Sequence, residues 1–143
     1  MCSYLIILAI ALLQPFSGQE ERLCEIRISG IRSSNGQLIL AAFDSQEDFA
    51  REVPFREICL SKRGLYNGTL TCRMPLPEGV FGITLLDDED GNGRMKYNGL
   101  GIPREGFGFS NFVIRGLRRP VLEDFDFNMG QERRTVHIQV CYI

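Results

Sequence analysis

The sequence predicts an all-β protein, an antiparallel β-sandwich of about seven strands, and three observations support this prediction. Short apolar segments recur at regular spacing with turn-forming residues between them, and few show a helical period. The chain has 143 residues, enough for one domain with its own core. It also keeps an even number of cysteines beyond its amino-terminal segment, as small exported domains often do. A small β-barrel is the competing architecture.

The first predicted elements are two strands and a helical turn. "CEIRISG", residues 24–30, alternates isoleucine with charged or polar residues, and "GQLILAAFD", residues 36–44, is a continuous apolar strand. The turn sequence "SSNG" between them predicts a hairpin. "SQEDFARE", residues 45–52, predicts a brief helical turn because Ser45 stands at an N-cap position and acidic residues follow it.

The remaining elements are further short strands. "FREICLS" is one, and the turn "PEG" predicts that "GTLTCRMPL" and "GVFGITLLDD" pair as a second hairpin. A long irregular loop then extends from residue 87 to about Arg119. After it come "RRPVLEDFDFN", where Phe125 and Phe127 alternate along a strand, and the last strand, "RTVHIQVCYI".

The amino-terminal segment predicts export. Residues 1–18 hold no charged side chain, and their apolar run from Tyr4 to Leu13 is too short to span a bilayer but resembles a secretory signal peptide. A retained anchor is the alternative to a cleaved signal. We therefore expect a single mature domain, residues 19–143, that is secreted or extracellular, or periplasmic or in the envelope if the source is bacterial. Asn67, in Asn-Gly-Thr within a turn, is a candidate glycosylation site.

The cysteines predict disulfides rather than a metal site. Cys2 lies in the signal segment, which leaves Cys24, Cys59, Cys72 and Cys141. These allow three pairings, and we lean towards Cys59 with Cys72 and Cys24 with Cys141. Side-chain parity favours a different solution, since Cys24 and Cys72 each share a face with apolar neighbours. The pairing stays open. The formal net charge of −2 gives no indication of a nucleic-acid partner.

The loop "DDEDGNGRMKYNGLGIPREGFGFSN", residues 87–111, resembles half of a calcium loop. Asp88, Asp90 and Asn92 match the first, third and fifth ligand positions, a glycine takes the sixth, and the carbonyl of Arg94 stands at the seventh. Hard oxygen ligands of this kind suit Ca²⁺.

The second half of the calcium pattern is missing. Lys96 occupies the ninth position, and Gly99 stands where a bidentate glutamate is expected. Glu105, Asp87 or a more distant carboxylate would have to complete the shell. The alternative is a glycine-rich turn in which Asp and Asn side chains cap main-chain amides.

The same region resembles a known family. "LPEGVFGITLLDDEDGNGRMKYNGLGIPREGFGFSN" is similar to the signature of domain of unknown function 2141, a family of exported and mostly bacterial proteins, and the later "LEDFDF" is similar to a second segment of that family. The matching positions are Leu76, Pro77, Gly79, Asp88 to Gly93, Gly101 to Pro103, Glu105 to Asn111, Glu123, Asp124 and Phe127.

The resemblance implies an exported β-sandwich of the transthyretin or immunoglobulin-like sort, and it implies no established activity. Two positions depart from the family pattern. Lys96 stands where members usually have an aspartate, which removes one candidate ligand, and Phe107 replaces the commoner tyrosine.

Two other groups of residues are candidate binding surfaces. Phe107 and Phe109, together with Tyr97, would form an aromatic platform for a glycan or peptide, or else the two phenylalanines point to one face of a strand and pack into the core. The segment "RGLRRP" gathers three arginines that would receive an anionic group or remain solvated.

These observations favour a non-catalytic binding or structural module of unknown ligand, stabilised by calcium through the acidic loop. Its expected partner is an extracellular protein or a glycan. The alternatives are a secreted hydrolase that uses loop carboxylates, and a purely structural extracellular protein without a metal. A hydrolase is disfavoured because nothing in the sequence marks a cleft between two carboxylates.

Overall fold

In the computed structural model, the described part of the chain is an eight-stranded sandwich with two short helices. It comprises residues 20–95, 99–100, 103–116 and 118–143. Residues 1–18, the predicted signal peptide, lie outside these ranges, as do Lys96, Tyr97, Gly101 and Ile102 among the residues considered above. The elements are β1 (Glu21–Ser29), β2 (Gln37–Phe43), α2 (Gln46–Arg51), β3 (Arg56–Ser61), β4 (Leu70–Pro77), β5 (Gly79–Asp88), β6 (Gly106–Phe109), α3 (Leu122–Phe125), β7 (Asp126–Met129) and β8 (Arg134–Gln139).

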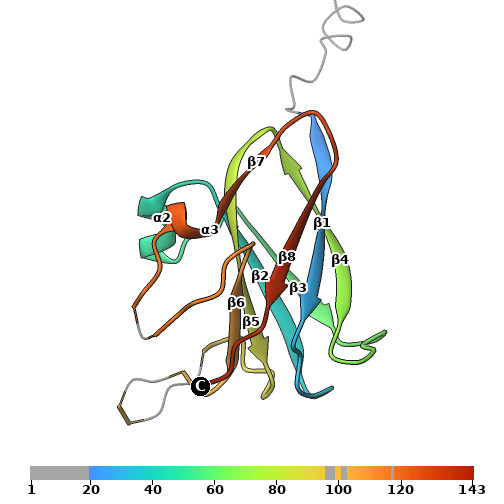
Figure 1. The fold of residues 1–143 in the computed structure, drawn as a ribbon, viewed down its shortest axis with the longest axis vertical. Coiled ribbons are helices and arrows are strands. Elements are labelled where there is room, and N and C mark those ends of the chain that lie inside the picture. Colours follow the sequence, from blue (N-terminus) through green and yellow to red (C-terminus); the bar gives the residue numbers. More distant parts are fainter. Residues whose placement is uncertain (1–19, 96–98, 101–102, 117) are drawn as a thin grey trace, which may run out of the picture.

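The strands form two sheets packed face to face, as Figure 1 shows. One sheet has the order β4-β1-β8, and the other has the order β3-β2-β5-β6 with β7 also paired to β5. Ile26 and Val136 from the first sheet meet Leu38, Leu40 and Ile83 from the second, and all five are fully buried. The predicted sandwich is confirmed, because the described strands fall into two separate sheets rather than one closed barrel. One pairing, β1 with β8, is parallel.

Both predicted hairpins are wrong. β1 pairs with β4 and β8, whereas β2 pairs with β3 and β5 in the other sheet. β4 and β5 likewise belong to different sheets. The turn residues between each pair bend the chain across the sandwich instead of returning it along the same sheet. β2 is buried along nearly its whole length, so its central place in the second sheet follows from its continuous apolar sequence.

The region before β7 also differs from the prediction. The expected helical turn at residues 45–52 is confirmed as α2, which Ser45 caps by accepting a hydrogen bond from the Asp48 N–H. The predicted strand containing Phe125 and Phe127 is instead α3 followed by β7. Because Phe125 is helical, it packs with α2 and Phe43 on the outer side of the second sheet, while Phe127 enters the main core.

β6 lies within the long loop, where one of the two interpretations of Phe107 and Phe109 places a strand, and it runs against the carboxyl-terminal segment. The N–H of Phe107 donates to the Cys141 carbonyl at 3.0 Å, and the Cys141 N–H donates back at 2.7 Å. This approach requires glycines, because a Cβ on Gly108 would stand 2.5 Å from Ile138 Cγ2, and one on Gly106 would clash with Tyr142.

The four cysteines of the described region are free thiols. Our leaning towards a Cys24–Cys141 bond is wrong. Cys24 is level with Arg134 in the parallel β1–β8 pair, so Cys141 lies seven residues further along, roughly 23 Å away at strand spacing. The Cys59–Cys72 bond is also wrong. Cys59 is exposed and alternates along β3 with Ile58 and Leu60, which pack against the core, so it points away from the core, whereas Cys72 of β4 packs against the core. Cys24 and Cys72 are diagonal neighbours on β1 and β4.

Candidate functional site

The candidate site begins where β5 ends in two consecutive aspartates. Side chains alternate between the faces of a strand, so Asp87 follows Ile83 and Leu85 towards the sandwich interior, and Asp88 follows Leu86 towards the outer face. Both aspartates are fully buried. A buried carboxylate needs compensation, and the two obtain it in different ways.

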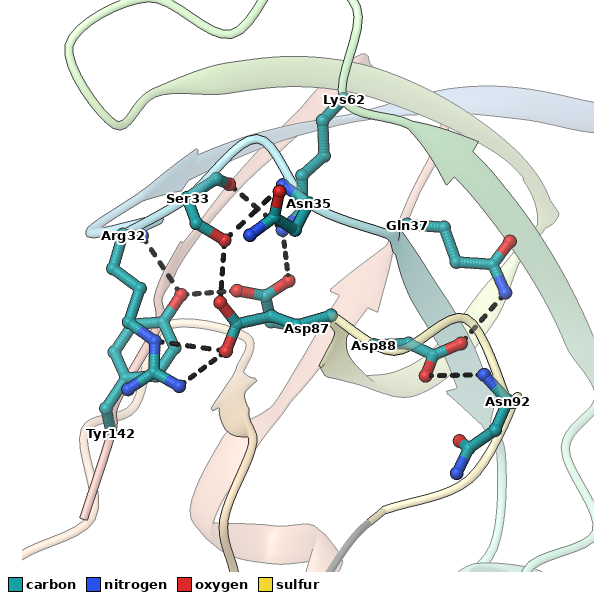
Figure 2. A network of polar contacts seen from close by, with 10 residues as sticks. Arg32, Ser33, Asn35, Gln37, Lys62, Asp87, Asp88, Asn92 and Tyr142 are labelled. Atoms are coloured by element: carbon teal, nitrogen blue, oxygen red, sulfur yellow. Dashed lines mark hydrogen bonds and ion pairs between the residues drawn. The ribbon is translucent and has the colours of Figure 1, made fainter.

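Asp87 is neutralised inside the sandwich, as Figure 2 shows. Its carboxylate forms an ion pair with Lys62 Nζ at 2.6 Å and accepts a hydrogen bond from the Tyr142 hydroxyl. Lys62 also donates to the Ser33 carbonyl at 3.0 Å. Burial, followed by this bond to Asp87, raises the pKa of Tyr142 well above its usual range, so the hydroxyl remains a donor. Asp87 is thereby committed to the interior and is not available as a metal ligand.

Glu89 extends this network towards the surface. Its carboxylate accepts hydrogen bonds from the Arg32 guanidinium, at 2.5 and 3.0 Å, and from the Ser33 hydroxyl at 2.6 Å. The bond from Arg32 is the main cause that lowers the pKa of Glu89. Arg32 also stacks over the Tyr142 ring at 4.2 Å from its centroid. Glu89, the first residue after β5, is therefore anchored to the connection between β1 and β2.

Asp88, on the outer face, has no cation among the described residues. It accepts hydrogen bonds from Gln37 Nε2 at 2.9 Å, from the Gly93 N–H at 2.9 Å and from the Asn92 N–H at 3.2 Å. Burial alone would raise its pKa, but these bonds and one from Asp90 outweigh burial and lower the pKa of Asp88. Asp88 is thus an ionised carboxylate that folds the loop around itself.

Glu105 lies directly before β6, across from Asp88. The β5–β6 register ends with Asp87 opposite Gly106, so its next step places Glu105 opposite Asp88 on the outer face. Side-chain oxygens of Asp88, Asp90 and Glu105 all lie within 4.8 Å of one another. Like charges directly opposite on neighbouring strands destabilise a sheet unless something neutralises them.

The Glu105 side chain is the least satisfied group of this cluster. It is 4% exposed, and its Oε2 atom is buried without a hydrogen-bond partner among the described residues. Burial, a hydrogen bond to Asp90 and the charges of Asp90 and Asp88 raise the pKa of Glu105. Within the described structure, this atom is thus an unpartnered carboxylate oxygen that faces two further carboxylates, Asp88 and Asp90.

The structure brings three of the five predicted ligands together. Asn92 and Arg94 are used otherwise: Asn92 Oδ1 accepts the Arg94 N–H at 2.8 Å, and the Asn92 N–H bonds to Asp90 Oδ1 at 3.1 Å. Both interactions are of the kind predicted by the alternative interpretation, a turn in which Asp and Asn side chains cap main-chain amides. The turn and the acidic cluster therefore coexist, since the turn brings Asp90 back towards Asp88.

The two phenylalanines of β6 lie on one face, as one of the two interpretations predicts. That face is the outer face of the sheet, where both rings are half-buried. Phe109 packs on Phe125 with ring centroids 5.0 Å apart, and Phe107 lies 6.1 Å from Phe109. They belong neither to a fully exposed platform nor to the main core. They line a groove of about 640 Å³, which sequence reasoning missed because the residues that form it are spread along the chain from Ile39 to Ile143.

Fold and site together describe an all-β sandwich with a carboxylate cluster at the end of its second sheet. The chain belongs to the DUF2141 family, described as an uncharacterized protein conserved in bacteria, whose family model matches residues 26–137. Searches of curated proteins and of solved structures returned no match. Within the described ranges, no helix is long and apolar enough to cross a membrane.

Proposed function

We propose that this chain is an exported, non-catalytic binding module whose acidic loop takes a calcium ion. The observation that carries this proposal is the buried Glu105 Oε2 atom, which has no hydrogen-bond partner in the described structure and faces Asp88 and Asp90. All the donor atoms are oxygens, which suits a hard cation and disfavours zinc. Ca²⁺ is favoured over Mg²⁺ because it tolerates an irregular shell of loop ligands.

In this proposal the ion links two carboxylates from different parts of the chain whose negative charges no described cation neutralises. It would neutralise the repulsion between Asp88 at the end of β5 and Glu105 at the start of β6. Asp90 would supply a further oxygen from the exposed side, and water would complete the shell. The loop would then be fixed beside the groove, which Gly93 and Pro103 help to line.

The hydrolase alternative draws on one observation, the opposite pKa shifts of Asp88 and Glu105. Such pairs can act as base and acid. Both carboxylates, however, are at most 4% exposed, so neither can reach the bond of a substrate. A turn without metal would explain the caps made by Asp88 and Asn92 but leaves the Glu105 carboxylate unexplained. Calcium accounts for both features.

Thermal unfolding of the mature protein tests the metal proposal. We expect calcium at about 10 mM to raise the unfolding midpoint relative to chelator, because a ligand that binds only the folded state stabilises it. Magnesium should do so more weakly. The Asp90→Asn variant should lose most of this shift, while Asp44→Asn, which changes an exposed acid outside the cluster, should retain it. An equal shift in wild type and Asp90→Asn would count against the site.

Export would allow two modifications. Asn67 is exposed in a tight turn, where its φ is 50°. Under oxidising conditions Cys24 and Cys72 are the pair placed to bond, because they are diagonal neighbours on β1 and β4. Peptide mapping of protein secreted from a eukaryotic host tests both. An unmodified Asn67, or a bond that links Cys24 to another cysteine, would contradict this part of the proposal.

A further inference from the structure

The groove lies over rows of side chains that cross the outer face of the second sheet. Strand register places Ile39, Leu86 and Phe107 in one row, on β2, β5 and β6. The next row holds Ala41, Thr84 and Phe109. All six residues line the groove. Five of them are apolar, so the floor is a continuous apolar surface.

The outer face of a sheet usually meets water in a sandwich, but here other segments rise around it. α2 and the residue after it, Glu52, contribute one part of the wall, and Ile114 and Arg119, between β6 and α3, contribute another. Figure 1 shows both helices on this side of the molecule, away from β1, β4 and β8. At about 640 Å³ the groove is within the range of sites that hold one small molecule. Its concave shape disfavours a flat protein partner.

The charges around the groove indicate the polar part of its ligand. Its described cationic lining residues are Arg118 and Arg119, and its acidic ones are Glu52 and Glu57 from α2 and β3. Arg118 is paired with Asp124 at 3.1 Å. Within the described structure no carboxylate lies within ion-pair distance of Arg119, whose exposed guanidinium is therefore available to a ligand.

We propose that the groove binds a single-chain anionic amphiphile, a free fatty carboxylate of about ten carbons, with its hydrocarbon chain on the Ile39–Leu86–Phe107 row and its head group at Arg119. The apolar floor stabilises the chain by burial, and the guanidinium forms charge-assisted hydrogen bonds to the carboxylate. Repulsion by Glu52 and Glu57 directs the head group away from their side of the groove. This inference names the ligand class of the binding module proposed above and rests on that proposal.

Calorimetric titration with decanoate, below its micelle concentration, tests the inference. Chelator is present throughout, so that calcium salts of decanoate do not form and the measurement does not depend on the metal site. We expect one decanoate to bind per chain and decanol to bind about tenfold more weakly. Leu86→Gln should weaken both ligands, because it places an amide on the apolar floor.

Two matched variants isolate the head group. Arg119→Gln should weaken decanoate about tenfold and leave decanol unchanged, whereas Arg63→Gln, at an exposed arginine in another loop, should change neither. Decanoate should change the amide NMR shifts of wild-type residues on β2, β5 and β6 rather than on β1 and β4. This measurement needs no variant, so it does not depend on whether a variant folds.

Three results would overturn the inference: no decanoate binding at millimolar concentration, equal losses in Arg119→Gln and Arg63→Gln, or a concentration-dependent dimer that covers the groove. If calcium raises the unfolding midpoint but decanoate does not bind, the proposed groove ligand is refuted and the calcium proposal is not. If decanoate binds but calcium does not change the unfolding midpoint, the calcium proposal is refuted and the proposed groove ligand is not.

Discussion

Replacing Glu105 by glutamine separates two effects of the acidic cluster, the charge repulsion that destabilises the fold without metal and the stabilisation that calcium would provide. Glutamine keeps the size and shape of a protonated glutamate but removes the charge. In the absence of metal, Glu105 lies within 4.8 Å of two other carboxylates and is 4% exposed. We therefore expect Glu105→Gln to be more stable than wild type without metal, which is the reverse of what most buried substitutions do.

The size of the effect follows from the geometry. Two unit charges 4.8 Å apart repel by about 1 kcal/mol in a water-like dielectric and by about 3 kcal/mol at an effective dielectric constant of about 20. The raised pKa of Glu105 limits this cost, since the folded protein can hold a proton on the side chain instead. We expect a gain of about 1 kcal/mol near neutral pH, or roughly 4 °C in the unfolding midpoint.

The pH dependence gives the gain a second signature. The pKa of Glu105 is raised from 4.5, so in wild type its stabilising contribution is fully present below about pH 4.5 and is lost as pH rises through the folded value. The difference between Glu105→Gln and wild type should therefore be small at pH 4 and larger at pH 7. Calcium should stabilise wild type more than Glu105→Gln, because the variant lacks one of the proposed ligands, and so it should reduce or reverse the difference in stability.

The assay is thermal or urea unfolding of wild type, Glu105→Gln and Glu78→Gln, in chelator and in about 10 mM calcium. For a dissociation constant of about 0.1 mM, calcium should stabilise wild type by about 2.7 kcal/mol. Glu78→Gln removes an exposed acid distant from the cluster and should match wild type throughout. The reasoning is refuted if Glu105→Gln is less stable than wild type in chelator, or if it keeps the full calcium shift.

Three further predictions concern the rest of the fold. Lys62→Met should lower the free energy of unfolding in urea by about 3–5 kcal/mol because it leaves Asp87 buried without a cation. Adding Asp87→Leu should recover most of this loss. A loss below about 1 kcal/mol would contradict the role of the ion pair. Gly108→Ala should cost about 1–3 kcal/mol by forcing β6 from Ile138, whereas Gly130→Ala, with open space around its Cα, should be neutral. Under reducing conditions burial raises the pKa of Cys24 to about 12 and of Cys72 to about 11, so their stabilising contribution is complete below about pH 9 and is lost as the pH rises towards these values. In urea unfolding across this pH range, the double Cys→Ser variant should show a flatter decline in stability than wild type.

Local sequence patterns predicted most of the strands but not how they pair. The continuous apolar run of β2 and the alternation in β8 are visible in the sequence because each depends only on which faces are buried. Pairing depends on where a bend sends the chain. The turn "SSNG" is as suited to crossing between sheets as to closing a hairpin, and only the packing of both sheets decides between them.

The acidic cluster was predictable to the extent that its carboxylates are close in sequence. Asp88 and Asp90 follow a known spacing, but Glu105 joins them only through the register between β5 and β6. The ion pair between Lys62 and Asp87 also joins distant positions, so nothing in the local sequence distinguished Asp87 from Asp88. Strand alternation would have separated the two aspartates, since one must face the core if Leu85 does.

The segment after Glu105 explains why this register holds. Gly106 and Gly108 allow the carboxyl-terminal segment to approach, and Ser110 donates from its buried hydroxyl to the Phe125 carbonyl at 2.6 Å while accepting the Ile83 N–H at 3.0 Å. A slip of β6 by one residue would lose both bonds, put the phenylalanines against the core and turn Glu105 away from Asp88. The glycine and serine positions of this segment therefore act on the acidic cluster from a distance. They fix the position of Glu105, and thereby whether its carboxylate joins Asp88 and Asp90 in the acidic cluster.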